Sequence, residues 1–298
     1  MTSGPVILQA RAISKQRRRS EPPRGEEPVP PARAGRLHAP PSRTRSVPHL
    51  FDCWDDVSPR IRAAKELRLF LDFDGTLVDF RARPDQVRLG DRARSALRAL
   101  ANHQSAHVAV VSGRRRASLV HFVKVPRVRF FGLYGWENEQ GFHLPQATRR
   151  IFSQVRAMLA GLPAKAPGIY IEDKDLSLAV HFWAASPQAR RRARAWLRKS
   201  VERFSAHLRV IPSGNVWEIV PRQVRGKGVA VQNMLRTLRT PFLPVYVGDD
   251  LTDEAAFKVL RDGITVHVGP RRRTNARFWL RNADEVCSFL ERLEAELP

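Results

Sequence analysis

One stretch of the chain, LFLDFDGTLVDF at residues 69–80, constrains the fold and the chemistry more than any other. Its apolar start predicts a buried strand, and this strand ends in two aspartates two positions apart, Asp72 and Asp74. Because side chains alternate along a strand, both carboxylates can face one site where the chain leaves the sheet. One carboxylate can then attack phosphorus while the other handles a proton. Gly75 permits a tight turn near a phosphate, and Thr76 offers hydroxyl and amide donors.

Two further segments supply groups that suit a phosphate. VAVVSGR at 108–114 is an apolar run that stops at Ser112 and Gly113, which can present a hydroxyl and free amides. Lys227 opens a helical pattern and can neutralise both a phosphate and a nucleophile. Taken singly, these residues are also explained by a turn and a solvated surface lysine.

The segment VYVGDDLTDEAAF at 245–257 places three acids at the end of another apolar run, namely Asp249, Asp250 and Asp253. Acids clustered at a strand end suit Mg²⁺, which prefers oxygen ligands. A helix cap followed by acidic first-turn residues would explain part of the same cluster. The order of all four segments indicates a phosphoryl-transfer site.

This order resembles that of the haloacid dehalogenase superfamily of phosphatases, and three more segments resemble trehalose-6-phosphate phosphatase. They are GLYGWE at 132–137, IEDKDLSLAVHFW at 171–183 and SGNVWEIVPRQVRGKG at 213–228. The resemblance runs from about Leu67 to the C-terminus. Two residues depart from the family pattern: Tyr134 stands where histidine or asparagine is common, and Trp183 stands where an arginine is expected. Tryptophan would offer a stacking face for a sugar in place of that arginine's donors.

The resemblance implies Mg²⁺-dependent hydrolysis of trehalose 6-phosphate through an aspartyl-phosphate on Asp72, with Asp74 as acid and base. The implied phosphate-binding residues are Thr76, Ser112, Gly113 and Lys227. The implied metal ligands are Asp72, the backbone carbonyl of Asp74 and Asp249, with Asp250 and Asp253 in the outer shell. The implied substrate-binding residues are Arg114, Glu137, Glu172, Lys174, His181, Asn215 and Glu218. From the residues alone, Glu172 and Lys174 also fit a surface ion pair, and Asn215 fits a turn.

Alternating strand and helix patterns predict an α/β fold with a Rossmann-like parallel sheet core of the haloacid dehalogenase type. Residues 146–221 have a different order of helix and strand patterns, which predicts an inserted α+β cap between core segments 58–145 and 222–298. The expected cap elements are helices 148–161 and 186–205, strands 168–172 and 176–183, and a hairpin at 208–220. Residues 1–57 are rich in Arg and Pro, and we expect them to be disordered.

Composition adds limits on partners and compartment. The 298 residues include 52 Lys plus Arg against 29 Asp plus Glu, and the resulting formal charge of +23 attracts sugar phosphates, nucleic acid and acidic lipid alike. No apolar run reaches the roughly 18 residues that span a bilayer. Only two cysteines occur, which favours a reducing, cytoplasmic setting without a disulfide framework.

Two alternatives to a trehalose-6-phosphate phosphatase remain at this point. The first is a related capped phosphatase for another sugar phosphate, such as sucrose-6-phosphate or mannosyl-3-phosphoglycerate. The second is a catalytically inactive regulatory or nucleic-acid-binding protein that works through its basic N-terminal tail. The presence of every motif acid in the sequence counts against the second alternative.

Overall fold

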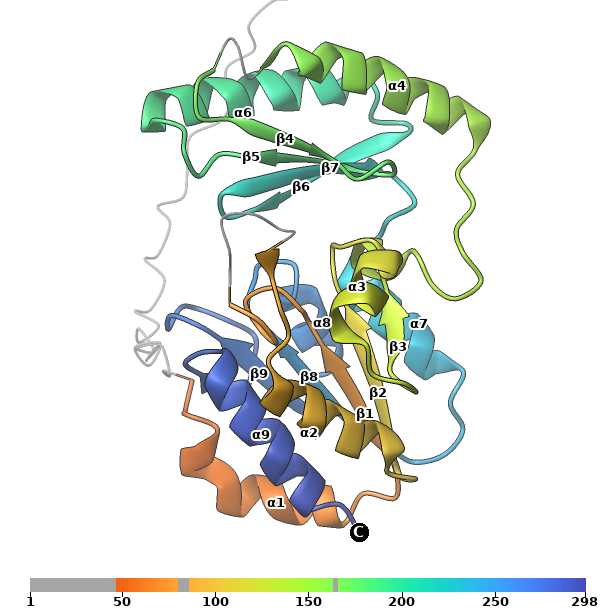
Figure 1. Ribbon diagram of the computed structural model, residues 1–298, viewed down its shortest axis with the longest axis vertical. Helices are drawn as coiled ribbons and strands as arrows, with labels where there is room; N and C mark the ends of the chain where they lie inside the picture. The colour runs from red at the N-terminus through yellow and green to blue at the C-terminus, as the bar shows by residue number, and fades with distance from the viewer. Residues whose placement is uncertain (1–46, 80–85, 163–165) are drawn as a thin grey trace, which may run out of the picture. The chain divides into compact units, whose positions relative to one another are not determined.

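Parallel strands form the central sheet of this computed structural model, which describes residues 47–79, 86–162 and 166–298 (Figure 1). In spatial order, its six strands are β10 (Phe278–Leu280), β9 (Ile264–Val268), β8 (Leu243–Gly248), β1 (Leu67–Leu71), β2 (Ala106–Val111) and β3 (Arg129–Phe131). In the register of β1, Leu71 lies opposite both Val110 and Val247. Because neighbouring strands run in the same direction, their carboxyl ends lie at one edge of the sheet.

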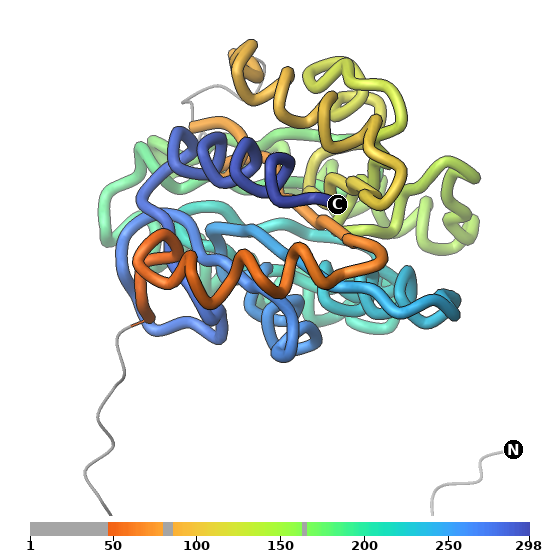
Figure 2. Tube along the Cα trace, turned by 90° about the horizontal axis from the view of Figure 1, so that it is seen from below, coloured from red at the N-terminus to blue at the C-terminus, as the bar shows by residue number. Residues whose placement is uncertain are grey.

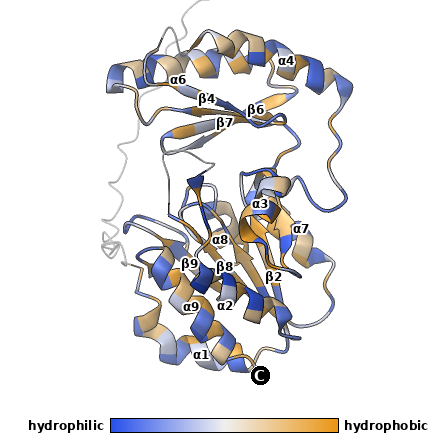
Figure 3. Cartoon of the chain, in the orientation of Figure 1, coloured by the Kyte–Doolittle hydropathy of each residue, from blue (hydrophilic) through white to orange (hydrophobic). Residues whose placement is uncertain are grey.

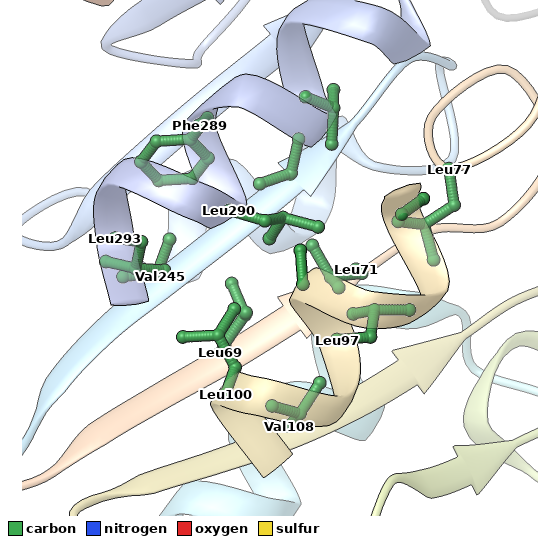
Figure 4. Packing of buried hydrophobic residues seen from close by; sticks show 14 of the residues in the cluster. Leu69, Leu71, Leu77, Leu97, Leu100, Val108, Val245, Phe289, Leu290 and Leu293 are labelled. Carbon is green, nitrogen blue, oxygen red and sulfur yellow. The ribbon is translucent and has the colours of Figure 1, made fainter. Parts of the chain in front are cut away.

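Helices cover both faces of this sheet. The core helices are α1 (Trp54–Arg62), α2 (Asp91–Asn102), α3 (Arg116–Val123), α7 (Lys227–Arg236), α8 (Glu254–Val259) and α9 (Ala283–Ala295), with short 3-10 turns at Phe51–Cys53 (η1) and Leu133–Gly135 (η3). On one face, Leu97 of α2 and Leu290 of α9 pack with Leu69 and Leu71 of β1 (Figure 4). On the other face, Phe70 packs with residues of α7 and α8. Burial on both faces explains why β1 reads as a continuous apolar run.

The inserted segment forms a second, antiparallel sheet with its own helices and its own apolar cluster. Its elements are α4 (Gln146–Ala160), β4 (Tyr170–Asp173), β5 (Leu178–His181), α6 (Pro187–Glu202), β6 (Leu208–Ser213) and β7 (Val216–Pro221). The strands pair in the order β4-β5-β7-β6. Phe152 of α4 and Leu197 of α6 belong to a cluster with Val180 and Ile219 of the sheet. Figure 3 shows how apolar and polar residues alternate along these two helices.

These elements confirm the predicted α/β fold class with an inserted α+β cap. The expected cap helices, strands and hairpin all occur, each shifted by at most a few residues at its ends. The exact core and cap boundaries at 145/146 and 221/222 stay predictions. Among the described helices, none combines the length and the apolar character that crossing a membrane requires.

The prediction that residues 1–57 are disordered is wrong for residues 48–57. Residues 1–46 lie outside the described part of the chain. The amide of Leu50 donates to the carbonyl of Trp279 at 3.0 Å, and the amide of Trp279 donates to the carbonyl of Pro48 at 3.0 Å. Helix α1 then lies beside α9 (Figure 2), where Trp54 meets Phe289 edge to face. The composition of residues 48–57 does not indicate this folding, because their partners, Trp279 and Phe289, lie near the other end of the chain.

Candidate active site

The carboxyl edge of the core sheet brings together three segments that are far apart in the sequence. Asp72 follows β1, Ser112 follows β2 and Asp249 follows β8. The amide of Asp72 donates to the carbonyl of Val247 at 3.0 Å, and the amide of Ser112 donates to that of Phe131 at 3.1 Å. Asp72 and Ser112 are therefore each held by the strand next to their own.

A buried lysine links two aspartates at this edge. Nζ of Lys227 lies 2.7 Å from Oδ2 of Asp72 and 2.9 Å from Oδ1 of Asp253. Lys227 is the first residue of α7, and Asp253 immediately precedes α8. Burial alone would lower the pKa of Lys227, but the charges of Asp253 and Asp72 outweigh burial and raise that pKa. The side chain therefore stays an ammonium group.

Asp72, Asp249 and Asp253 form an acidic cluster in which one carboxylate oxygen from each residue lies within 4.8 Å of the others. Burial raises the pKa of Asp72 to about 7, against the opposing charge of Lys227 and with a further contribution from Asp253. Burial and the charge of Asp72 also raise the pKa of Asp249. Three carboxylates thus face one ammonium group, and a divalent cation with oxygen ligands would relieve their repulsion. This donor set fits a hard metal ion.

The two acids expected in the outer shell occupy different places. Asp253 accepts hydrogen bonds from Lys227, from the hydroxyl of Tyr246 at 2.7 Å and from the amide of Asp250 at 2.9 Å. Its oxygens are thus engaged by protein donors. Asp250 instead accepts a hydrogen bond from the hydroxyl of Ser213 in β6. Asp253 is placed to hold Lys227, whereas Asp250 joins the core to the cap.

Asp74 is held by Arg114, an arginine that the sequence analysis assigned to the substrate. Nε and Nη2 of Arg114 each donate to one oxygen of Asp74 at 2.7 Å. The guanidinium carbon also lies 5.4 Å from the ring centroid of Phe73 and 5.2 Å from that of Phe122. A forked and stacked arginine fixes the direction of the carboxylate. The side chain of Asp74 keeps 27% of its surface exposed, so an incoming group can reach it.

The predicted phosphate-binding residues lie around the same edge. Thr76 is fully buried, and its hydroxyl donates to Oδ1 of Asp249 at 3.3 Å. Ser112 is buried directly after β2. A Cβ added to Gly113 would lie 2.9 Å from the ring of Tyr134, which is too close for any side chain. Glycine at this position therefore leaves room for the ring of Tyr134 where it lies.

Four predicted substrate-binding residues form two linked pairs on the cap sheet. Nζ of Lys174 lies 3.2 Å from Oε1 of Glu218, and Nε2 of His181 lies 3.0 Å from Oε2 of Glu172. Glu218 also accepts a hydrogen bond from the hydroxyl of Ser177 at 2.5 Å. Burial opposes the charge of Lys174, but Glu218 and Glu172 outweigh it and raise the pKa of this lysine. The cap thus presents a charged ammonium group beside two carboxylates.

Glu137, another predicted substrate-binding residue, is engaged by the chain that follows β2. It accepts hydrogen bonds from the guanidinium group of Arg115 and, at 2.8 Å, from the amide of Arg116. Arg115 continues to the cap, where it donates to the carbonyl of Lys174 at 3.1 Å. In this structure Glu137 thus holds Arg115 and Arg116, which follow the turn at Ser112–Arg114, here called the phosphate loop.

Asn215 lies in the turn between β6 and β7. Its side-chain oxygen accepts a hydrogen bond from Arg190 of α6 at 2.8 Å, and its carbonyl accepts one from the amide of Phe182 at 2.7 Å. These contacts match the turn role that the residues alone allowed. Trp183, the second departure from the family pattern, lies just past β5 with 52% of its surface exposed.

Sequence reasoning missed two residues of this site, Arg115 and Tyr246. Arg115 stands in a run of three arginines, and only the turn after β2 decides that one of them reaches the cap. Tyr246 lies in a strand that is otherwise apolar. A buried tyrosine hydroxyl needs a partner, and this was the signal available in the sequence.

Comparisons with known proteins point to one family. The family model described as trehalose-phosphatase matches residues 70–281. Trehalose 6-phosphate phosphatase RA3 of Zea mays is 31% identical over 264 residues, which cover 79% of this chain and 72% of that protein. Trehalose-phosphate phosphatase B of Arabidopsis thaliana is 31% identical over 271 residues, covering 83% and 71%. The solved C-terminal domain of C. albicans trehalose-6-phosphate phosphatase has the same fold, with a TM-score of 0.72, 20% identity and coverage of 85% and 100%.

Proposed function

The chain belongs to the trehalose-phosphatase family, and from this we propose that it hydrolyses trehalose 6-phosphate to inorganic phosphate and trehalose, the last step of trehalose biosynthesis. The observation that carries the proposal is the carboxylate of Asp72, which lies at a strand end 2.7 Å from the buried ammonium group of Lys227. The cation offsets the repulsion between an anionic nucleophile and a phosphate, and burial strengthens that effect.

Asp72 is the proposed nucleophile. Lys227 holds Oδ2 of this residue, so we assign the attack to Oδ1. A bond forms between Oδ1 and phosphorus as the bond from phosphorus to the sugar oxygen breaks, which leaves an aspartyl-phosphate. We assign the hydroxyl of Ser112 and the backbone amide of Gly113 as donors to the transferred phosphoryl group.

Asp74 is the proposed acid and base. It gives its proton to the departing sugar oxygen, and its carboxylate then takes a proton from the water that attacks the aspartyl-phosphate. This second step releases inorganic phosphate and returns Asp72 to its carboxylate form. Arg114 donates to both oxygens of Asp74. A protonated oxygen of Asp74 donates a hydrogen bond and cannot also receive one from Arg114 in the same direction. We therefore infer that Asp74 loses one of its two contacts with Arg114 when it is protonated in the substrate complex.

Mg²⁺ is the proposed cofactor. Asp72, Asp249 and the backbone carbonyl of Asp74 would hold it, and the acidic cluster supports this choice because its carboxylates outnumber the cations beside them. When bound, the ion supplies positive charge against the phosphate. Asp250 and Asp253 are assigned to positions outside its ligands.

Addition of Mg²⁺ is expected to raise the midpoint of thermal unfolding of the wild-type protein by several degrees. An ion that binds only the folded chain stabilises it by about 2.7 kcal/mol at a hundred times its dissociation constant. The variant Asp249→Asn is expected to show less than half of this shift, because one ligand charge is lost. Scanning fluorimetry with and without the ion measures both shifts, and equal shifts would contradict the assigned ligands.

The substrate is tested by measuring phosphate release in the presence of Mg²⁺. Trehalose 6-phosphate is compared with glucose-6-phosphate, sucrose-6-phosphate and mannosyl-3-phosphoglycerate. A strong preference for trehalose 6-phosphate is the expected result. Preference for another sugar phosphate would keep the chemistry and discard the substrate. Absence of turnover on all four would favour the regulatory or nucleic-acid-binding alternative.

Lys174→Ala is expected to lower kcat/KM for trehalose 6-phosphate by about 10- to 100-fold, because it removes a charged donor from the sugar side of the site. The loss with p-nitrophenyl phosphate should be much smaller, since that ester has no sugar to contact the cap. Lys199→Ala, which removes an exposed lysine of α6, serves as the control. Equal losses with the two esters would argue against a role for Lys174 in sugar recognition.

The cellular setting and partners form the last part of this proposal. Cys53 and Cys287 are both free thiols, which supports a reducing, cytoplasmic setting. The formal charge of +23 raises the local concentration of an anionic sugar phosphate. The nucleic-acid alternative predicts that the full chain retains RNA in a filter assay and that removal of residues 1–46 abolishes this retention.

A further inference from the structure

Tyr134 has a backbone conformation that bulky residues seldom adopt. Its φ is +60° and its ψ is +31°, and the preceding Leu133 has a φ of +48°. These angles lie in the left-handed region, which is unfavourable for residues with a large side chain. Such a conformation persists only where the surroundings impose it, and it occurs mainly at functional sites. The contacts of Tyr134 show what imposes it here.

On the core side, this residue is bound to the phosphate loop. The amide of Tyr134 donates to the carbonyl of Ser112 at 2.8 Å, and the amide of Leu133 donates to that of Arg114 at 2.8 Å. The aromatic ring covers Gly113, where a Cβ would meet ring atoms at 2.9 to 3.3 Å. The ring therefore occupies the space that a Cβ at position 113 would need.

The turn that contains Tyr134, η3 (Leu133–Gly135), is also packed against α7, the helix that begins at Lys227. Gly135 has a φ of +91°, and a Cβ at this position would lie 2.1 Å from the Cβ of Ala230 in α7. The backbone on both sides of Tyr134 is thus held by core elements that position the proposed phosphate site. The position of the Tyr134 side chain is therefore fixed relative to that site.

On the cap side, the hydroxyl of Tyr134 donates to Oε2 of Glu218 at 2.5 Å. The other oxygen of Glu218 accepts hydrogen bonds from Lys174 at 3.2 Å and from Ser177 at 2.5 Å. Both Tyr134 and Glu218 are buried. Burial, together with the charge of Glu218, raises the pKa of Tyr134, so the phenol stays protonated and remains a donor. Three protein donors therefore determine the orientation of this carboxylate.

We propose that Tyr134 is a positioning residue for substrate selectivity, which links the phosphate loop to the Glu218–Lys174 pair of the cap through a single hydrogen bond. The inference rests on the proposed function. A sugar phosphate makes contact at both ends of this link, with its phosphate at Ser112 and Gly113 and its sugar at the cap. A small phosphate ester reaches only the core end. Tyr134 should thus affect kcat/KM for a sugar phosphate more than kcat/KM for a small phosphate ester.

The direct test is Tyr134→Phe, which removes the hydroxyl and keeps the ring on Gly113. Values of kcat/KM are measured for trehalose 6-phosphate and for p-nitrophenyl phosphate, and their ratio is the selectivity. We expect this ratio to fall about tenfold, because a buried carboxylate loses one charge-assisted hydrogen bond. Most of the loss should lie in KM for the disaccharide phosphate, since the sugar is remote from the reacting bond.

Tyr246→Phe is the matched control. Tyr246 is also a buried tyrosine whose hydroxyl donates to a carboxylate, in this case Asp253 at 2.7 Å within the core. It has no part in the link to the cap. Its loss should reduce turnover of both esters by the same factor and leave the selectivity ratio unchanged.

A double-mutant cycle identifies the partner. The effects of Tyr134→Phe and Glu218→Leu on the selectivity ratio should be strongly non-additive, because either change removes the same hydrogen bond. Circular dichroism at the assay temperature confirms that each variant is folded. Additive effects would show that Tyr134 acts through another group, and they would overturn the proposal.

The outcomes for the inference and for the proposed function are distinct. If the wild-type protein prefers trehalose 6-phosphate and Tyr134→Phe keeps the same ratio, only the present inference fails. If the wild-type protein shows no preference for any sugar phosphate over p-nitrophenyl phosphate, the proposed function and this inference fail together. A tenfold fall in the ratio that Tyr246→Phe does not reproduce supports both.

Discussion

Asp72→Asn is expected to reduce phosphate release by about 10⁴-fold or more, the scale on which loss of a catalytic nucleophile acts in hydrolases. The amide keeps the size of the side chain but cannot form the bond to phosphorus. Lys227 keeps its second carboxylate, Asp253, at 2.9 Å, so the buried ammonium group is not left without an anion. Release of inorganic phosphate from trehalose 6-phosphate measures the effect.

The control for Asp72→Asn is a measurement of its stability, which shows whether the variant is folded. Burial raises the pKa of Asp72 to about 7, which means that the site disfavours its charged form in the absence of a bound cation. A neutral side chain of equal size should therefore leave the free energy of unfolding within about 1 kcal/mol of the wild type. Asp262→Asn, which changes an aspartate that is 95% exposed, should alter neither activity nor stability. Sustained turnover by a folded Asp72→Asn protein would refute Asp72 as the nucleophile.

Lys227→Met is expected to damage stability and activity together. The side chain is 2% exposed and lies between two buried carboxylates, so its removal leaves two anions without their cation. Breaking a buried pair in this way costs about 3 to 5 kcal/mol. Turnover of the folded fraction should fall by about 10³-fold, because the charge that offsets the incoming phosphate is lost. Denaturant unfolding followed by phosphate release measures both effects.

Two further variants separate the electrostatic cause from simple loss of packing. Lys258→Met makes the same change at an exposed position of α8 and should cost less than about 0.5 kcal/mol. Lys227→Met combined with Asp253→Asn removes one of the stranded charges and should recover part of the lost stability. If the double variant is no more stable than Lys227→Met alone, stranded charge is not the reason for the loss.

The core of the candidate site could be predicted because its determinants are local. Asp72, Ser112 and Asp249 each follow an apolar run within one or two residues. Parallel strands align their carboxyl ends, so residues just past those ends must share an edge of the sheet. The same logic predicted the cap elements, since helical and strand periodicities differ along residues 146–221.

The side-chain pairing within the site could not be predicted in the same way. Two residues expected to bind the substrate show this: Arg114 donates to Asp74 in the structure, and Glu137 accepts from Arg115 and Arg116. Both arrangements depend on the direction in which the chain turns after β2. A residue type states which partners are chemically suitable, but it does not state which of several suitable partners is within reach.

By itself, the sequence determined the family, the fold class and the strand ends at which the acids gather, because periodicity and motif spacing are written in neighbouring residues. The tertiary structure alone decided that residues 48–57 are folded against β10 and α9, and that Tyr134 reaches Glu218 across 84 positions of sequence. Such contacts depend on the direction of a few backbone turns, among them the positive φ of Tyr134. Packing imposes that angle against the local preference of tyrosine, so the pattern of neighbouring residues does not predict it.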